Sequence, residues 1–245
     1  MSAAGAAWRL QCFETLPSTS DLCISLAEGG EPDGLAVLAL RQTHGRGSRG
    51  RNWDAPPGNL NLSVLLRPAG DAAEAGGWAL LAGLALFDAL APHAGAGLTL
   101  KWPNDLMLDG AKLAGILLDS AVQADGRLGW LVLGLGANLA HAPDLPDRRA
   151  ACLPAPAPRA QAVAASVLDR LAQWRRVRAV DGFAAIRAAW LARAHPSGTR
   201  LTVRSGGIVV GGRFAGLAED GSLLLQTGGR VHAFPTAEVL QSREG

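Results

Sequence analysis

The segment KWPNDLMLDGAKLAGILL at residues 101–118 decides how we expect this chain to fold. Two apolar stretches, residues 106–108 and 112–118, flank Asp109-Gly110, the strongest short signal for a β-hairpin. A two-residue turn predicts the pairs Leu108–Ala111, Met107–Lys112 and Asn104–Gly115. Because glycine has no side chain, the last pair would leave room for a ligand close to the backbone.

Further strands and helices are predicted on both sides of this hairpin. Apolar stretches of strand length lie at residues 10–13, 35–40, 60–66, 98–102 and 128–135, and helical spacing occurs at residues 21–28, 72–92, 161–180 and 182–194. The hydroxyl residues 18–20 can cap the first helix, and Pro92 is expected to end the second. An irregular, proline-rich connection is expected at residues 141–158.

The composition changes after residue 196. Short β-rich stretches at residues 201–204, 209–217, 223–226 and 231–234 are separated by glycine pairs and by Asp220-Gly221. This pattern favours a small barrel of about 45 residues. We therefore expect two domains, residues 1–196 and residues 197–245.

The overall composition is that of a globular protein. Of 245 residues, 49% are hydrophobic and 18% are charged, and the net charge of +2 argues against a protein that coats nucleic acid. The best apolar run, residues 79–91, is interrupted by Asp88 and is too short to cross a bilayer. Residues 1–8 show no signal peptide, and Cys12, Cys23 and Cys152 match no disulfide or metal pattern, so we expect a cytoplasmic protein without a protein-bound metal.

Lysine is rare in this chain. Only Lys101 and Lys112 occur among its 23 basic residues, and the others are arginines. A lysine ammonium is a compact charge that can reach one oxygen, whereas a guanidinium is a planar fork. Lys101 also precedes Pro103-Asn104-Asp105, a turn that should fix the direction of its side chains. Two lysines within twelve residues therefore indicate a chemical role.

A glycine-rich loop lies in the polar segment 41–59. Its sequence at residues 45–51 is GRGSRGR, which contains the spacing G-x-G-x-x-G. The following residues, RNWDAPP, cannot start the helix that a dinucleotide site requires, and no P-loop motif occurs. Three arginines and freely turning glycines suit an anion, and Trp53 suits an apolar or aromatic ligand. A solvated surface loop is the alternative.

Taken in order, several motifs resemble those of biotin protein ligases. They are residues 18–20, residues 42–51 with Trp53, residues 101–105, residues 112–117 and residues 134–138. The resemblance implies an α+β fold, a mixed β-sheet flanked by helices as in class II aminoacyl-tRNA synthetases, with a small C-terminal SH3-like β-barrel. It also implies the monofunctional type, since about ten residues before the first strand leave no room for an N-terminal DNA-binding domain.

The resemblance implies ATP-dependent formation of biotinyl-5'-AMP and transfer of the biotinyl group to a lysine of a biotin carboxyl carrier protein, of acetyl-CoA carboxylase or a related carboxylase. Mg²⁺ would accompany ATP, and neither DNA nor a membrane is an expected partner. The implied catalytic residues are Lys101 and Arg46. The implied biotin-binding residues are Ser18, Thr19, Ser20, Gln42, Gly45, Arg46, Gly47, Ser48, Lys101 and Gly115. The implied ATP-binding residues are Arg49, Arg51, Trp53, Asn104, Lys112 and Asn138.

The chain departs from the family pattern at three places. Ser48 stands where many members have arginine, Ser20 stands where they have asparagine, and residues 235–239 differ from the usual ending. We therefore carry over no role for residues 235–239. Lipoate ligation, a biotin sensor without catalysis and nucleic-acid binding are the rival functions. Their tests are exchange of pyrophosphate with lipoate, biotin binding without AMP formation, and salt-dependent DNA binding.

Overall fold

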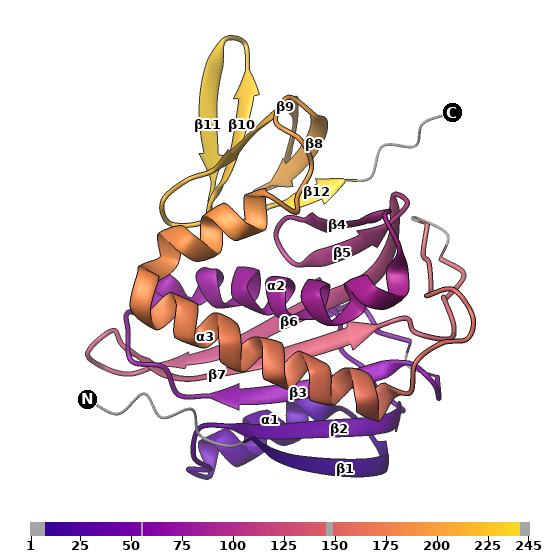
Figure 1. Ribbon diagram of the computed structural model, residues 1–245. Coiled ribbons are helices and arrows are strands. Elements are labelled where there is room, and N and C mark those ends of the chain that lie inside the picture. The colour runs from indigo at the N-terminus through magenta and orange to yellow at the C-terminus, as the bar shows by residue number, and fades with distance from the viewer. Residues whose placement is uncertain (1–7, 55, 146–148, 241–245) are drawn as a thin grey trace.

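The computed structural model describes residues 8–54, 56–145 and 149–240, and its centre is a seven-stranded sheet (Figure 1). The strand order is β1-β2-β3-β7-β6-β5-β4. Only β1 and β2 are parallel, and the other neighbours are antiparallel, so the mixed sheet is confirmed. The strands are β1 (Arg9–Leu16), β2 (Leu35–Gln42), β3 (Leu60–Leu66), β4 (Leu98–Lys101), β5 (Asp105–Leu108), β6 (Ala111–Val122) and β7 (Leu128–Ala137).

Helices cover both faces of this sheet. Helix α1 (Thr19–Glu28) packs on one face, where Cys23 and Ala27 contact Leu35 and Val37 of β2. Helices α2 (Ala75–Ala94) and α3 (Ala160–Leu191) cover the other face. Since successive side chains of a strand point to opposite faces, β2 supplies both cores and is buried on both sides.

Helix α2 corrects two expectations. Pro92 lies inside the helix, which continues to Ala94 and ends at Gly95 with φ +73°. The segment Ala72–Ala94, a short 3₁₀ turn η2 (Ala72–Glu74) followed by α2, is also long and apolar enough to cross a membrane, contrary to the prediction. Because 61% of its most apolar window is buried inside the protein, we interpret it as a core helix.

The hairpin at Asp109-Gly110 is confirmed, with one correction to its register. Both turn residues have positive φ, 49° and 74°, as a type I′ turn requires. The first two predicted pairs are present, but Gly115 pairs with Asp105 instead of Asn104. A bulge between Leu106 and Met107 shifts the register by one residue, which the sequence did not indicate.

The C-terminal strands form a second sheet beyond the end of α3 (Figure 1). Its order is β11-β10-β9-β8-β12, all antiparallel, from β8 (Arg200–Ser205), β9 (Ile208–Leu217), β10 (Leu223–Thr227), β11 (Arg230–Phe234) and β12 (Glu238–Leu240). Strand β12 was not predicted. Strands β11 and β12 are the two edges of this sheet in the described residues, so the expected SH3-like antiparallel unit is present without closure into a full barrel there.

One hydrophobic core runs through both sheets. It joins Leu100 and Trp190 to Val203 and Phe214. Within α3, Gly182 has φ +74° and interrupts the helix where the sequence separated two helices. The division into two domains at residue 196 stays a prediction, and the expectation about residues 1–7 lies outside the described residues.

Candidate functional site

Three cavities surround the glycine-rich loop and meet at Ser48 and Lys112, which line all three. The sheet cavity lies over the central sheet between α1, β3, β6 and β7. The second cavity lies between the loop, residues 101–105 and strand β12, and we call it the interdomain cavity because its lining comes from both predicted domains. The outer cavity lies between the loop and residues 143–145.

The floor of the sheet cavity is a buried network of neutral polar groups. The Ser63 hydroxyl lies 2.8 Å from that of Thr19 and 3.0 Å from that of Ser20. Gln42 Oε1 accepts hydrogen bonds from the Thr19 backbone amide at 2.7 Å and from its hydroxyl at 3.0 Å. Asn61, on the same strand as Ser63, is 2% exposed. A buried network that is satisfied in this way fixes the direction of each polar group.

Local sequence explains how this floor forms. The Ser18 hydroxyl accepts a hydrogen bond from the Asp21 amide and caps α1, so Thr19 and Ser20 fall in the first helical turn. The glycines of β7 leave space above the sheet. A Cβ atom at Gly134 would lie 2.6 Å from Ser20 Oγ, and one at Gly136 would lie 2.5 Å from the Trp53 ring.

Arg46 closes the side of the sheet cavity. Its guanidinium forms ion pairs with Asp21 of α1 at 2.8 Å and with Asp119 of β6 at 3.0 Å. Burial lowers its pKa, but hydrogen bonds and the charges of Asp119 and Asp21 outweigh that effect and raise the pKa above its ordinary value. Arg46 thereby joins the glycine-rich loop to two elements of the fold.

Lys101 lines the interdomain cavity and is 8% exposed. It ends β4, whose outer edge is held by residues 193–194: Leu100 N–H donates to the Arg193 carbonyl at 2.8 Å. The His195 imidazole lies near enough for the charge of Lys101 to act on it. Burial, and then this charge, lower the pKa of His195 below its ordinary value. The ammonium of Lys101 is thus placed on a supported strand beside a cavity.

Lys112 is shared by all three cavities. Its ammonium forms a hydrogen-bonded ion pair with Asp105 and lies 5.8 Å from the centroid of the Trp53 ring. Trp53 lines both the sheet cavity and the outer cavity, so its indole separates the two. Its Nε1 is buried and has no hydrogen-bond partner in the described part of the chain.

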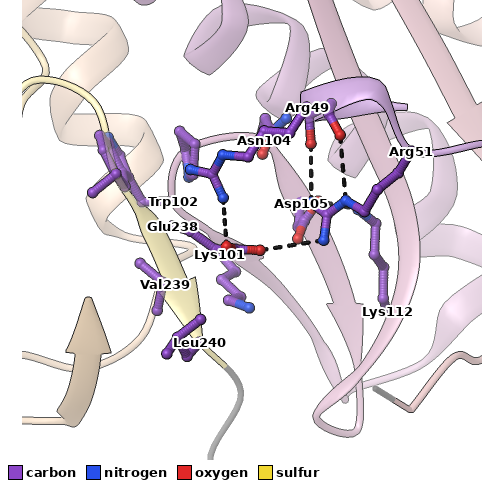
Figure 2. Close-up of a pocket in the computed structure, with 13 residues that line it drawn as sticks. Arg49, Arg51, Lys101, Trp102, Asn104, Asp105, Lys112, Glu238, Val239 and Leu240 are labelled. Atoms are coloured by element: carbon purple, nitrogen blue, oxygen red, sulfur yellow. Dashed lines mark hydrogen bonds and ion pairs between the residues drawn. The ribbon is translucent and has the colours of Figure 1, made fainter. Parts of the chain in front are cut away.

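Two loop arginines reach the C-terminal sheet. Arg49 Nη1 lies 2.6 Å from Glu238 Oε2, and Arg51 Nη1 lies 3.2 Å from Glu238 Oε1. Figure 2 shows these arginines converging on Glu238 beside Lys101. Positive groups therefore surround this cavity, and a single carboxylate of β12 joins two of them.

The predicted residues divide into those that the structure brings together and those that it does not. Seven of the biotin-binding set line the sheet cavity: Thr19, Ser20, Gln42, Arg46, Gly47, Ser48 and Gly115. Lys101 lines the interdomain cavity together with four of the ATP set, namely Arg49, Arg51, Asn104 and Lys112. Gly45 lines the outer cavity. Ser18 lines none of the three cavities, and its hydroxyl caps α1.

Asn138 also lies apart from the three cavities. It is 2% exposed, and its Nδ2 donates to the Ala151 carbonyl at 3.0 Å. Asn104 supports the hairpin, because its Nδ2 donates to the Ile116 carbonyl at 2.7 Å. Both amides hold neighbouring backbone in place.

Four residues of the site were not among the predicted site residues: Asn61, Ser63, Glu238 and Asp105, the last of which was noted only as part of a turn. Asn61 and Ser63 did carry a signal, because they are the polar residues at positions i and i+2 of an otherwise apolar strand and so share one face. Asp105 lies next to the predicted Asn104. Glu238 carried none, because only the folding of β12 against β8 brings it to the loop.

The described residues contain no group of three or more His, Cys, Asp or Glu side chains that could hold a metal ion. Asp105 and Glu238 line the interdomain cavity, and each forms an ion pair with a basic residue. Mg²⁺ commonly binds through one or two carboxylates together with substrate phosphates. These residues therefore fit a Mg²⁺ ion that enters with a nucleotide.

Two protein-family models and several known proteins match this chain. A model described as the biotin/lipoate A/B protein ligase family matches residues 12–138, and one for the biotin protein ligase C-terminal domain matches residues 197–240. A biotin--[acetyl-CoA-carboxylase] ligase of Paracoccus denitrificans is 39% identical over 213 residues, covering 83% of this chain and 88% of the relative. Its counterpart from Mycobacterium tuberculosis is 34% identical over 255 residues, covering 98% and 92%.

A solved structure is similar over nearly the whole chain. It is the biotin protein ligase from Aquifex aeolicus in complex with biotin and ATP, which matches with a TM-score of 0.80 and 25% identity. The match covers 96% of this chain and 99% of the other. The similarity therefore extends over both sheets.

Proposed function

Because the chain belongs to the biotin/lipoate A/B protein ligase family, we propose that it attaches biotin to a carrier protein in two ATP-dependent steps. In the first, the biotin carboxylate attacks the α-phosphorus of ATP, which gives biotinyl-5'-AMP and releases pyrophosphate. In the second, the ε-amine of a carrier lysine attacks the mixed anhydride, which gives an amide and releases AMP. The chain is a biotin protein ligase.

The meeting of three cavities at Ser48 and Lys112 is the observation that carries this assignment. Joining a carboxylate to a nucleotide requires sites for the acid, for the phosphates and for the base, all adjoining the point of reaction. Such adjacency can contribute much of the rate, because the reactants are held together before they react.

We assign biotin to the sheet cavity. The fused-ring head of biotin carries polar groups that suit the hydroxyls and amides of Thr19, Ser20 and Gln42. Leu62, Ile116 and Leu135 provide apolar walls for the remainder. Small-molecule sites combine an apolar lining with a few placed polar groups in this way.

The phosphates are assigned to the interdomain cavity. Two unit charges 4 Å apart interact by about 4 kcal/mol at an effective dielectric constant of 20, so a carboxylate and a phosphate must be brought together by cations. Lys101, Lys112 and Arg49 line this cavity. We assign to Lys101 the catalytic role of contacting both the biotin carboxylate and the α-phosphate. When Mg²⁺ is bound with the phosphates, it stabilises the leaving pyrophosphate.

The adenine is assigned to the outer cavity, whose volume of about 610 Å³ is in the range of small-molecule sites. Trp53, Pro143 and Leu145 give it an aromatic and apolar lining. Arg46, predicted from sequence to be catalytic, forms ion pairs with Asp21 and Asp119. We propose that these ion pairs let it close the sheet cavity over the anhydride. Exclusion of water protects such an intermediate.

The protein substrate is a biotin carboxyl carrier protein. The names of the relatives point to the carrier of acetyl-CoA carboxylase, and we propose that carrier as the main substrate. Since the reaction uses ATP and acts on a metabolic carboxylase, we also propose a cytoplasmic location.

Biotin-dependent exchange of labelled pyrophosphate into ATP tests the first step. Exchange should require biotin and should be much slower with lipoate in its place. Transfer is tested by incubation with a carrier domain and with its lysine-to-arginine variant, of which only the former should gain mass. Biotin binding without exchange would support the sensor alternative and contradict the ligase assignment.

A further inference from the structure

Glu238 carries an arrangement that the proposed reaction does not by itself require. Its Oε2 pairs with Arg49 and its Oε1 pairs with Arg51. Arg204 Nη1, from β8, lies 3.7 Å from the same Oε2. The Glu238 side chain is only 22% exposed. A carboxylate that bridges two guanidinium groups through separate oxygens fixes both of them, because such charge-assisted hydrogen bonds are directional.

Arg51 is held on all sides of its guanidinium. Besides Glu238, it donates from Nε to the Ser48 carbonyl at 3.3 Å and from Nη2 to the Ser48 hydroxyl at 3.2 Å. All three nitrogens therefore have partners within the loop or on β12. Arg51 therefore connects Ser48, which lines all three cavities, to Glu238 of β12.

Arg49 holds a strained backbone conformation. Its φ of 60° and ψ of 37° are left-handed, a region that residues with a side chain rarely adopt because Cβ comes too close to the following carbonyl oxygen. Such a conformation persists only where surrounding contacts hold it. Two backbone hydrogen bonds, from Gly47 N–H to the Arg51 carbonyl and from Arg51 N–H to the Ser48 carbonyl, close the loop across Arg49. The Arg49 side chain is 48% exposed, and its ion pair with Glu238 ties it to β12.

We propose that Glu238 is a positioning residue of the nucleotide site, which acts through Arg49 and Arg51 to hold the glycine-rich loop against the interdomain cavity. This inference rests on the proposed function for its effect on ATP. The carboxylate neutralises cations that would otherwise repel one another and move the loop outward. Because Glu238 pairs with Nη1 of Arg49, the Nε and Nη2 groups of Arg49 can still donate to a phosphate; a guanidinium carries five N–H groups.

The variant E238Q tests this role, because glutamine keeps the shape and removes the charge. We expect the Kd of a non-hydrolysable ATP analogue, measured by calorimetry, to rise about tenfold, while the KM for biotin changes less than twofold. Trypsin should cleave after Arg49 or Arg51 several-fold faster. The matched control is E219Q, since Glu219 is an exposed carboxylate of the same C-terminal region and forms no ion pair with the described residues.

A double-mutant cycle separates positioning from general stability. If Glu238 acts through the arginines, E238Q should add little to the effect of R49Q combined with R51Q. An unchanged or lower Kd in E238Q, or unchanged cleavage of the loop, would overturn the proposal. Wild-type protein that binds the analogue but shows no biotin-dependent exchange would refute the proposed function alone, because cleavage and nucleotide binding still decide the role of Glu238.

Discussion

The sheet cavity and the interdomain cavity are built by opposite means. Neutral polar groups on α1, β2 and β3 form the floor of the first, and their hydrogen bonds connect them directly. Charged groups from a loop, from β4 and from β12 line the second, and ion pairs join them. Under the proposed assignments, we infer that recognition of biotin is fixed by the fold, whereas activation depends on charges that the C-terminal sheet helps to place.

The largest effect is expected at Lys101, on the charged side. K101A should slow biotin-dependent pyrophosphate exchange by about 10²- to 10³-fold, comparable to the loss of a group that stabilises developing charge in a transition state. The KM for biotin should rise by a much smaller factor, because the biotin carboxylate loses one contact while the polar floor of the sheet cavity is untouched. R230Q, an exposed change on β11, is the control. Exchange at the wild-type rate in K101A would contradict the catalytic role.

A methyl group at Gly136 should have the next largest effect, because it would move the Trp53 indole that separates the sheet cavity from the outer cavity. The added Cβ would lie 2.5 Å from the indole, so G136A must displace Trp53. We expect a rise of about tenfold or more in the KM for both biotin and ATP, in keeping with the cost of overpacking. Steady-state kinetics of exchange measures this.

The control for this variant lies on the same strand. At Gly129 an added Cβ would meet its nearest atom, the Ala121 carbonyl oxygen, at 3.4 Å, which is ordinary contact. G129A should therefore retain both KM values. If G136A and G129A behave alike, Trp53 does not divide the cavities as described.

On the neutral side, S63A should affect biotin alone. The change removes the Ser63 contact of the Ser20 hydroxyl and one of the two contacts of the Thr19 hydroxyl, which keeps Gln42. A buried polar group left without its partner costs about 1–3 kcal/mol. We expect the KM for biotin to rise about five- to tenfold and the KM for ATP to stay within twofold. S120A, at an exposed position of β6, is the control. Equal rises in both KM values would show that the two cavities are not independent.

The same contrast explains what the sequence could predict. Thr19, Ser20, Gln42 and the glycines lie in short motifs whose local structure, a helix cap or a hairpin, follows from neighbouring residues. Glu238 meets Arg51 across 187 positions of sequence, and no local pattern encodes that contact. The bulge at Leu106 similarly shifted Gly115 from Asn104 to Asp105, because tertiary context overrides turn-derived register.

The smallest effect concerns the pH dependence of stability, which should arise from the charged side of the site and not from the neutral side. The polar floor of the sheet cavity consists of hydroxyls and amides, which do not titrate, whereas His195 lies beside Lys101. Burial and the Lys101 charge lower the folded-state pKa of His195 below 6.5, so the unfolded chain binds the proton first as the pH falls. Stability from this group is therefore complete above pH 6.5 and decreases below it.

H195Q should show a flatter dependence of unfolding free energy on pH between 7.5 and about 5, measured by urea denaturation. Identical slopes for H195Q and wild type would place the acid sensitivity elsewhere and remove this distinction between the charged side and the neutral side.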